Sequence, residues 1–310
     1  MIENPITWPG GARCACAITF DMDADSLIHI SRPKDGHTRL YPISMGQYGP
    51  MVGVPRILET YRRLGIKQSF FVPGWCIEQY PQTVEAILKA GHEVGHHGYL
   101  HEDPTEHSLA EQTYWFDRAL DVHKSFTGKT PSGYRAPVYN ATQGVIDLLI
   151  ERGFSYDSSL MGADIPFMLK TDKGDLVEIP VHWGNDDWPQ FAHYAEIGYM
   201  MPVAAPSTGL RAFQEEFEAQ YEAGGFWMGI WHPFLTGRLA RWRQVEHWLE
   251  DMLSTRDVWF APLHEIAAYV RSCHATASHK IRVDRLPYYD LPVLMAEPRA
   301  PQRSGEETDG

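Results

Sequence analysis

The sequence predicts an α/β protein, a distorted TIM-like (β/α)7-8 barrel that forms a single domain over residues 1–295. Short apolar runs alternate with amphipathic helical segments along most of the chain, which is typical of parallel strands joined by helical crossovers. Polar residues follow the ends of the apolar runs, where barrel proteins carry their sites. No change of composition divides the 310 residues, and 44% of them are hydrophobic, which is sufficient for one large core.

The first expected strand covers residues 14–20 and ends at three alternating acids, Asp21, Asp23 and Asp25. The glycines and prolines of residues 26–50 interrupt the pattern and predict a long loop, and loops of such length are usually functional. A helix is expected over 54–65, because a proline stands near its start and a glycine at its end.

The later strands are predicted from apolar or β-branched runs, and the later helices from helical spacing of apolar residues closed by glycine. The remaining strands are expected at 68–73, 92–97, 132–135, 176–181, 225–231 and 258–261. The remaining helices are expected at 81–90, 109–126, 142–152, 206–223, 238–253 and 263–270. Residues 296–310 have no apolar side chain beyond alanine and predict a disordered tail.

Charge and composition exclude several classes of partner. The formal net charge is −13, with 40 acidic against 27 basic residues, so nucleic acid and anionic membranes are poor partners. No window has the roughly 20 apolar residues of a membrane span, and residues 1–9 lack the features of a signal peptide. Four cysteines are too few for a disulfide framework in a chain of this length. The sequence therefore predicts a cytoplasmic protein.

Histidines near the middle of the predicted barrel have the spacing of metal ligands. His97 and His101 are four positions apart, so a helical turn would direct both rings to one point. A catalytic divalent metal usually takes three protein ligands and keeps a position for water. Asp23, at the end of the first strand, is the expected third ligand.

The other strand-end residues indicate hydrolysis of an amide-like C–N bond. Asp21 is placed to accept a proton from a metal-activated water, and Arg135 to keep Asp21 oriented and ionised. His232 is placed to protonate a departing nitrogen, and Asp157 ends another strand at the same mouth. Each group alone has an ordinary explanation as a turn, cap, core or salt-bridge residue. Their common position at strand ends favours one site.

Five motifs in this order resemble the polysaccharide deacetylase superfamily, also called NodB-homology or carbohydrate esterase 4. They are Thr19-Phe20-Asp21-Met22-Asp23, His97-Gly98-Tyr99-Leu100-His101, Arg135-Ala136-Pro137, Tyr156-Asp157-Ser158-Ser159 and Trp231-His232-Pro233. The resemblance covers roughly residues 12–272 and implies the NodB fold. It also implies Asp21 as general base, His232 as general acid, and a divalent metal, usually Zn²⁺, on Asp23, His97 and His101.

Three features resemble the branch of cyclic imide hydrolases, cofactor-independent allantoinases and peptidoglycan-deacetylase-like proteins. They are the Asp-x-Asp spacing, the insert at 26–53 and the segment 159–166. Aromatic loops at 41–48 and 183–191 are expected to cover the mouth, which favours a small cyclic amide, imide or ureide. The alternatives are an N-acetylglucosamine or peptidoglycan deacetylase and a non-catalytic, metal-containing carbohydrate-binding module. The insert and the branch resemblance predict a homo-oligomer, and the residues expected to bind substrate are Tyr48, Asp157, Asp164 and Trp183.

Overall fold

The computed structural model describes residues 2–293 and has the predicted α/β fold, with a ten-stranded and mostly parallel sheet. The predicted tail at 296–310 lies outside the described residues. The strands are β1 (Cys14–Asp21), β2 (Ser69–Val72), β3 (Glu93–His96), β4 (Gly133–Tyr134), β5 (Tyr156–Asp157), β6 (Phe167–Thr171), β7 (Gly174–Glu178), β8 (Phe226–Trp231), β9 (Val258–Phe260) and β10 (Val283–Arg285).

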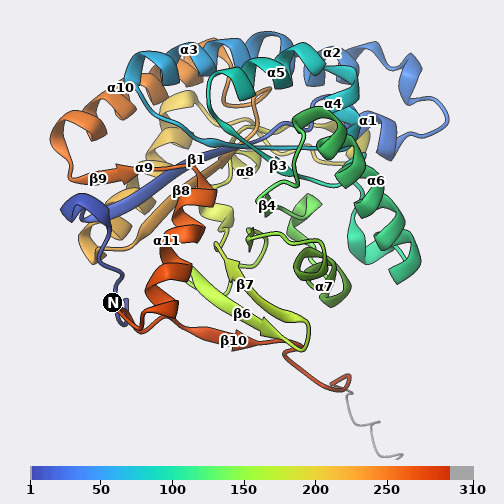
Figure 1. Cartoon of the computed structure of the whole chain (residues 1–310). Coiled ribbons are helices and arrows are strands. Elements are labelled where there is room, and N and C mark those ends of the chain that lie inside the picture. The colour runs from blue at the N-terminus through green and yellow to red at the C-terminus, as the bar shows by residue number, and fades with distance from the viewer. Residues whose placement is uncertain (1, 294–310) are drawn as a thin grey trace, which may run out of the picture.

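Helices cover both faces of this sheet. Figure 1 shows α3, α5 and α10 side by side across one face, with α11 on the other. The helices are α1 (Ser26–Ser31), α2 (Leu40–Tyr48), α3 (Val54–Leu64), α4 (Gly74–Gln79), α5 (Pro81–Lys89), α6 (Leu109–Thr127), α7 (Gln143–Glu151), α8 (Trp188–Phe191), α9 (Pro206–Ala223), α10 (Leu239–Thr255) and α11 (Leu263–Ala275). None of the helices in residues 2–293 has the length and apolar character needed to cross a membrane.

The sheet runs in the order β10-β6-β7-β5-β4-β3-β2-β1-β8, and β9 pairs with the first half of β1. Within the described residues, the named strands do not form a closed ring of hydrogen bonds. One parallel bridge pairs Asp186, in the segment that follows β7, with Ile230 of β8. The barrel is thus distorted, and its seam lies between β7 and β8.

Besides the short helices α4 and α8, two regions differ from the sequence-based prediction. The expected loop at 26–50 contains α1 and α2, and a π-helical turn at Gly49–Gly53 continues into α3. Its glycines permit close approach: a Cβ on Gly46 would lie 2.5 Å from the Ala24 carbonyl oxygen, and one on Gly53 would lie 2.4 Å from the Pro233 carbonyl oxygen. The insert therefore packs on the two segments that carry Asp23 and His232.

The second difference is the antiparallel pair formed by β6 and β7. The sequence predicted only one strand here, because the polar residues of the β6–β7 turn obscure the alternation of β6. Strand β10 then extends the sheet by pairing in parallel with β6.

The core continues to the ends of the strands. All eight residues of β1 are buried, because helices cover both faces of the sheet. Phe20 lies near the end of β1, and its ring stacks on Phe70 at a centroid distance of 5.5 Å and packs against Trp231 at 6.2 Å. This packing fixes the strand ends from which Asp21 and His232 project.

Candidate active site

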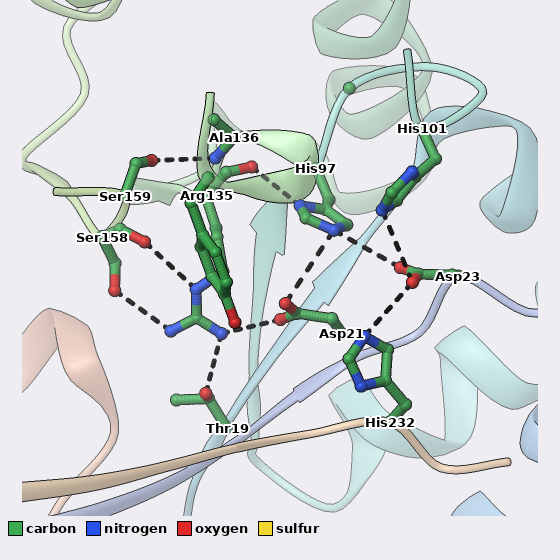
Figure 2. Close-up of polar contacts among 12 residues, drawn as sticks. Thr19, Asp21, Asp23, His97, His101, Arg135, Ala136, Ser158, Ser159 and His232 are labelled. Carbon is green, nitrogen blue, oxygen red and sulfur yellow. Dashed lines mark hydrogen bonds and ion pairs between the residues drawn. The ribbon is translucent and has the colours of Figure 1, made fainter. Parts of the chain in front are cut away.

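Asp23, His97 and His101 lie together beyond the carboxyl ends of β1 and β3 (Figure 2). Their ligand atoms are all within 4.8 Å of one another. The Asp23 carboxylate oxygens lie 3.4 Å from Nε2 of His97 and 3.5 Å from Nε2 of His101. Both oxygens are buried and have no hydrogen-bond partner among the described residues. An uncompensated buried carboxylate facing two imidazole nitrogens fits a divalent cation.

The protonation of Asp23 and His101 also suits a metal site, whereas for His97 the effect of burial is outweighed by Asp21 and Asp23, which raise its pKa. Burial opposes ionisation of Asp23, yet His101, His97 and His232 hold its pKa well below the usual range. Burial lowers the pKa of His101 to about 4, which leaves the neutral ring that metal binding requires. Nδ1 of His97 lies 2.7 Å from the Arg135 carbonyl oxygen. Donation by Nδ1–H to this oxygen leaves the Nε2 lone pair directed at Asp23.

The segment from His97 to His101 is an irregular loop, so the predicted helical turn is wrong. Gly98 and His101 have φ values of 69° and 63°, in the left-handed region. The Glu102 carboxylate holds the loop by accepting hydrogen bonds from the backbone N–H of Tyr99 at 2.9 Å and of Leu100 at 2.7 Å. Glu102 therefore supports the ligand loop, a role that the sequence did not indicate.

Asp21 is held from beneath the site by Arg135. Nη1 of Arg135 donates to Oδ1 of Asp21 at 2.7 Å and to Oγ1 of Thr19 at 2.8 Å (Figure 2). The Arg135 side chain is fully buried, and its guanidinium lies 4.2 Å from the centroid of the Phe71 ring. Arg135 is not among the residues that line the cavity described below. Its geometry is that of a positioning residue for Asp21.

Ser158 and Ser159 hold Arg135 and the residue that follows it. Ser158 accepts hydrogen bonds from Arg135, with its carbonyl oxygen at 3.2 Å and its Oγ at 3.0 Å. Oγ of Ser159 accepts from the Ala136 N–H at 2.9 Å and donates to Oδ1 of Asp157 at 2.7 Å. Burial raises the pKa of the Asp157 and Glu178 carboxyls, so this adjacent pair retains a proton. Asp157 is thus part of the support beneath the site.

His232 reaches the site from β8 and is fixed by Asp187. Nδ1 of His232 lies 2.6 Å from Oδ1 of Asp187, and Nε2 lies 3.4 Å from Oδ2 of Asp23. Burial alone would lower the pKa of His232, but Asp187, with Asp23 and Asp186, raises it to about 10. The His232 side chain is therefore a protonated imidazolium that points at the proposed metal ligands.

The sequence indicated no role for Asp187, which stands in the Trp-rich loop between β7 and α9. Its Oδ2 accepts hydrogen bonds from the backbone N–H groups of His232 at 3.0 Å and Thr236 at 3.1 Å, and from the Thr236 hydroxyl at 2.5 Å. Asp186, Asp187 and His232 also form a group with metal-binding spacing. Because the oxygens of Asp187 already accept four donors, this group is better described as an Asp–His pair than as a second metal centre.

A cavity of about 230 Å³ opens over these groups. Its walls are mainly apolar and aromatic, and α1 contributes Leu27 and Ile30 to them. The predicted loop at 183–191 contributes Trp183, Asp186 and Trp188. The predicted cover by residues 41–48 does not occur at this cavity: those residues form most of α2, and α1 lies at the cavity instead.

Four residues were predicted to bind substrate. Trp183 lines this cavity, whereas Tyr48, Asp157 and Asp164 do not. The Tyr48 hydroxyl accepts a hydrogen bond from Arg56 at 2.8 Å, and the Arg238 guanidinium lies 3.6 Å from the centroid of its ring. Asp164 lies in separate depressions near β6 and β10. These positions depend on long-range packing, which short motifs do not encode.

Comparisons with known proteins agree with the motifs and the fold. A family model described as polysaccharide deacetylase matches residues 47–156. The peptidoglycan deacetylase of Helicobacter pylori is 30% identical over 277 residues, covering 81% of this chain and 94% of that protein. A peptidoglycan deacetylase-like protein of Gibberella zeae is 40% identical over 248 residues, covering 71% and 70%. The crystal structure of a candidate polysaccharide deacetylase from Mycobacterium smegmatis has a TM-score of 0.84 and 35% identity, covering 88% of this chain and 96% of that chain.

Proposed function

Because the chain belongs to the polysaccharide deacetylase family, we propose that it is a metal-dependent hydrolase that removes acetyl groups from the amide nitrogen of amino sugars. The sequence had favoured a small cyclic substrate. The names of the relatives support the alternative better, since both refer to peptidoglycan deacetylases. The substrate prediction is revised accordingly, and the small cyclic substrate becomes the second candidate.

One observation supports catalysis rather than metal binding alone. Asp21 and His232 both lie beside the Asp23–His97–His101 group, and neither is needed to complete that set of three metal ligands (Figure 2). Oδ2 of Asp21 lies 3.9 Å from Nε2 of His97, and Nε2 of His232 lies 3.4 Å from Asp23. A binding module would not need a base and an acid beside its metal site.

In the proposed reaction these two residues exchange protons with water and substrate. A divalent cation, when bound, would supply Lewis acidity that polarises an amide carbonyl and acidifies water. Asp21 accepts the proton of the attacking water while Arg135, which also donates to the Thr19 hydroxyl, holds the Asp21 carboxylate in place. The water oxygen bonds to the carbonyl carbon, and His232 donates the Nε2 proton to the nitrogen as the C–N bond breaks. The products are a carboxylate and an amine.

The cavity supports the second candidate. It is small, about 230 Å³, and includes Trp183, Trp188 and Ile30 in its walls, which suits a compact ring better than a polymer groove. Hydrolysis of a small cyclic amide, imide or ureide would use the same proton transfers with the leaving nitrogen retained in the product.

A substrate panel separates the two candidates. Purified protein would be stripped with a chelator, reloaded with zinc, and assayed for acetate release from N-acetylglucosamine tetramer and for opening of succinimide, hydantoin and allantoin rings. We expect zinc-dependent acetate release that the Asp21→Asn variant lacks. Ring opening without acetate release would favour the second candidate. Glycan binding without any turnover would instead indicate a binding module and contradict both.

Zinc as the ion, a homo-oligomeric state and a cytoplasmic location stay predictions from the sequence. Elemental analysis of the purified protein tests the first, light scattering the second, and fractionation of producing cells the third.

A further inference from the structure

Asp186 presents to the cavity a carboxyl group that the proposed proton transfers do not use. It is 2% exposed, and its Oδ1 accepts a hydrogen bond from the Trp188 N–H at 2.7 Å. Its Oδ2 accepts a hydrogen bond from the Tyr139 hydroxyl. Asp186 thus differs from Asp187, whose acceptors are used by four internal donors. Each Asp186 oxygen has one such donor and retains capacity to accept another.

Tyr139 is held in position by an unusual backbone. Val138 and Tyr139, which follow the Arg135-Ala136-Pro137 motif, have φ values of 49° and 63°. A β-branched residue rarely adopts this left-handed conformation, and such strained positions concentrate at functional sites. The Tyr139 ring packs edge-on against Trp183 at a centroid distance of 4.9 Å. Tyr139 and Trp183 both line the cavity, so this wall is preorganised around Asp186.

We propose that Asp186, oriented by Tyr139, recognises a neutral hydrogen-bond donor next to the scissile amide of the substrate. This inference rests on the proposed hydrolysis of an amide at the same site. In an N-acetylated amino sugar the donor would be the hydroxyl vicinal to the amide. In a cyclic imide it would be the ring N–H. The chemistry of recognition is the same in both.

The charges around the cavity explain why the hydrogen-bond donor of the substrate would be neutral and why a substrate without it would bind more weakly. Asp21, Asp23 and Asp186 all line the cavity, so an anionic group on this wall would meet carboxylates. Burial raises the pKa of Asp186 to about 7, an effect that Asp187 increases and His232 opposes. Whether or not Asp186 is protonated, one oxygen can accept the donor. A substrate without a donor leaves a buried acceptor unsatisfied, which disfavours its binding.

Matched probes test this recognition without requiring turnover. Zinc-loaded Asp21→Asn protein would be titrated with trans-2-acetamidocyclohexanol and with N-cyclohexylacetamide, which lacks only the vicinal hydroxyl. A second arm would compare succinimide with N-methylsuccinimide to detect an N–H donor. We expect the hydroxylated probe to bind at least about tenfold more tightly than its partner. A preference only in the imide arm would support the same chemistry with a ring N–H as the donor.

Variants test whether Asp186 and Tyr139 cause the tighter binding of the probe that carries a hydrogen-bond donor. Adding Asp186→Ala or Tyr139→Phe should remove most of it, whereas the exposed controls Asp175→Ala and Tyr289→Phe should retain it. Thermal unfolding would verify that each variant folds. If Asp186→Ala does not fold, Tyr139→Phe remains as the test of this wall. Equal or undetectable binding of both members of each pair, or an equal loss for both members in the variants, would overturn the inference. A preserved preference in a protein that releases no acetate and opens no ring would refute the proposed function alone.

Discussion

Replacing Asp187 by asparagine should separate the proposed proton donation by His232 from the proposed metal binding. The carboxylate accepts the Nδ1–H of His232 on one oxygen and three further donors, from His232 and Thr236, on the other. Asparagine has only one oxygen, which the three donors would take. Its NH₂ group would then face Nδ1 of His232 and hold the ring neutral, with its proton on Nε2. A neutral imidazole is a far weaker acid than an imidazolium.

The size of the effect follows from the pKa of His232. Burial lowers this pKa and Asp187 raises it, and the net result is a rise from 6.5 to about 10, worth roughly 5 kcal/mol in favour of the imidazolium. If Asp187→Asn returns the pKa to about 6.5, the protonated fraction at pH 8 falls roughly thirtyfold. At pH 6 the fraction changes by less than about twofold. We therefore expect kcat/KM to fall at least roughly thirtyfold at pH 8, and further if the wrong tautomer persists.

The assay is a pH profile of acetate release from pH 5 to pH 10, with zinc content measured in parallel. In the proposed reaction His232 acts as an acid, so activity should be lost as pH rises through its pKa. The alkaline limb of Asp187→Asn should therefore lie at lower pH than that of the parent protein. A cation at Asp23 would repel the imidazolium and so shift the alkaline limbs of both proteins to lower pH, but the difference between the two limbs would remain. Exposed Asp175→Asn is the control. An unchanged alkaline limb and rate in Asp187→Asn, with zinc retained, would refute this role for the pair.

Three further substitutions test separate parts of the site. Asp21→Asn should lower kcat by roughly 10²- to 10⁴-fold while about one zinc per chain is retained; loss of zinc in a folded variant would instead make Asp21 a ligand. His101→Ala should lower zinc content and also reduce the rise in Tm that zinc produces in the parent protein, since binding to the native state stabilises it; an undiminished rise would contradict its role as a ligand. Burial raises the pKa of Glu178 and Asp157. The native state therefore holds a proton that the unfolded chain releases above about pH 4, and the free energy of unfolding declines as the pH rises beyond that value. Glu178→Gln should therefore raise the free energy of unfolding at pH 8 by on the order of 1–2 kcal/mol, which is measured as a higher Tm than that of the parent, with a smaller difference at pH 5. An equal difference at both pH values would show that the pair shares no proton.

The sequence predicted the features that depend on local pattern. Strand β1 and the acids that end it were predicted because apolar burial and alternation are properties of neighbouring residues. The structure brings His97 and His101 to Asp23 as their spacing suggested, although through a left-handed backbone at His101 and not through a helix. The insert at 26–50 was predicted to be a loop because Gly46 has the same local signature whether it breaks a helix or lets one approach another segment.

The features that were not predicted depend on which distant segments become neighbours. Asp187 and His232 are 45 positions apart, and no local pattern connects them. The same is true of Tyr139 and Asp186, which are 47 positions apart. Tyr48 was expected in a loop that covers the mouth, but its hydroxyl accepts a hydrogen bond from Arg56 and its ring packs against the guanidinium of Arg238. Aromatic character alone does not distinguish a residue that meets substrate from one that packs on arginine.

The seam between β7 and β8 assigns different roles to two consecutive acids. Asp186 pairs with Ile230 in a parallel bridge, and the Asp187 N–H donates to the Ile230 carbonyl oxygen at 3.1 Å. This register sets Asp187 beside His232 and leaves Asp186 to meet Tyr139 at the cavity. A shift of one residue would exchange the faces of the two side chains. Single substitutions should therefore separate the proposed proton donation from the proposed substrate recognition. A change of register at the seam should abolish both, because the bridge between Asp186 and Ile230 places both acids.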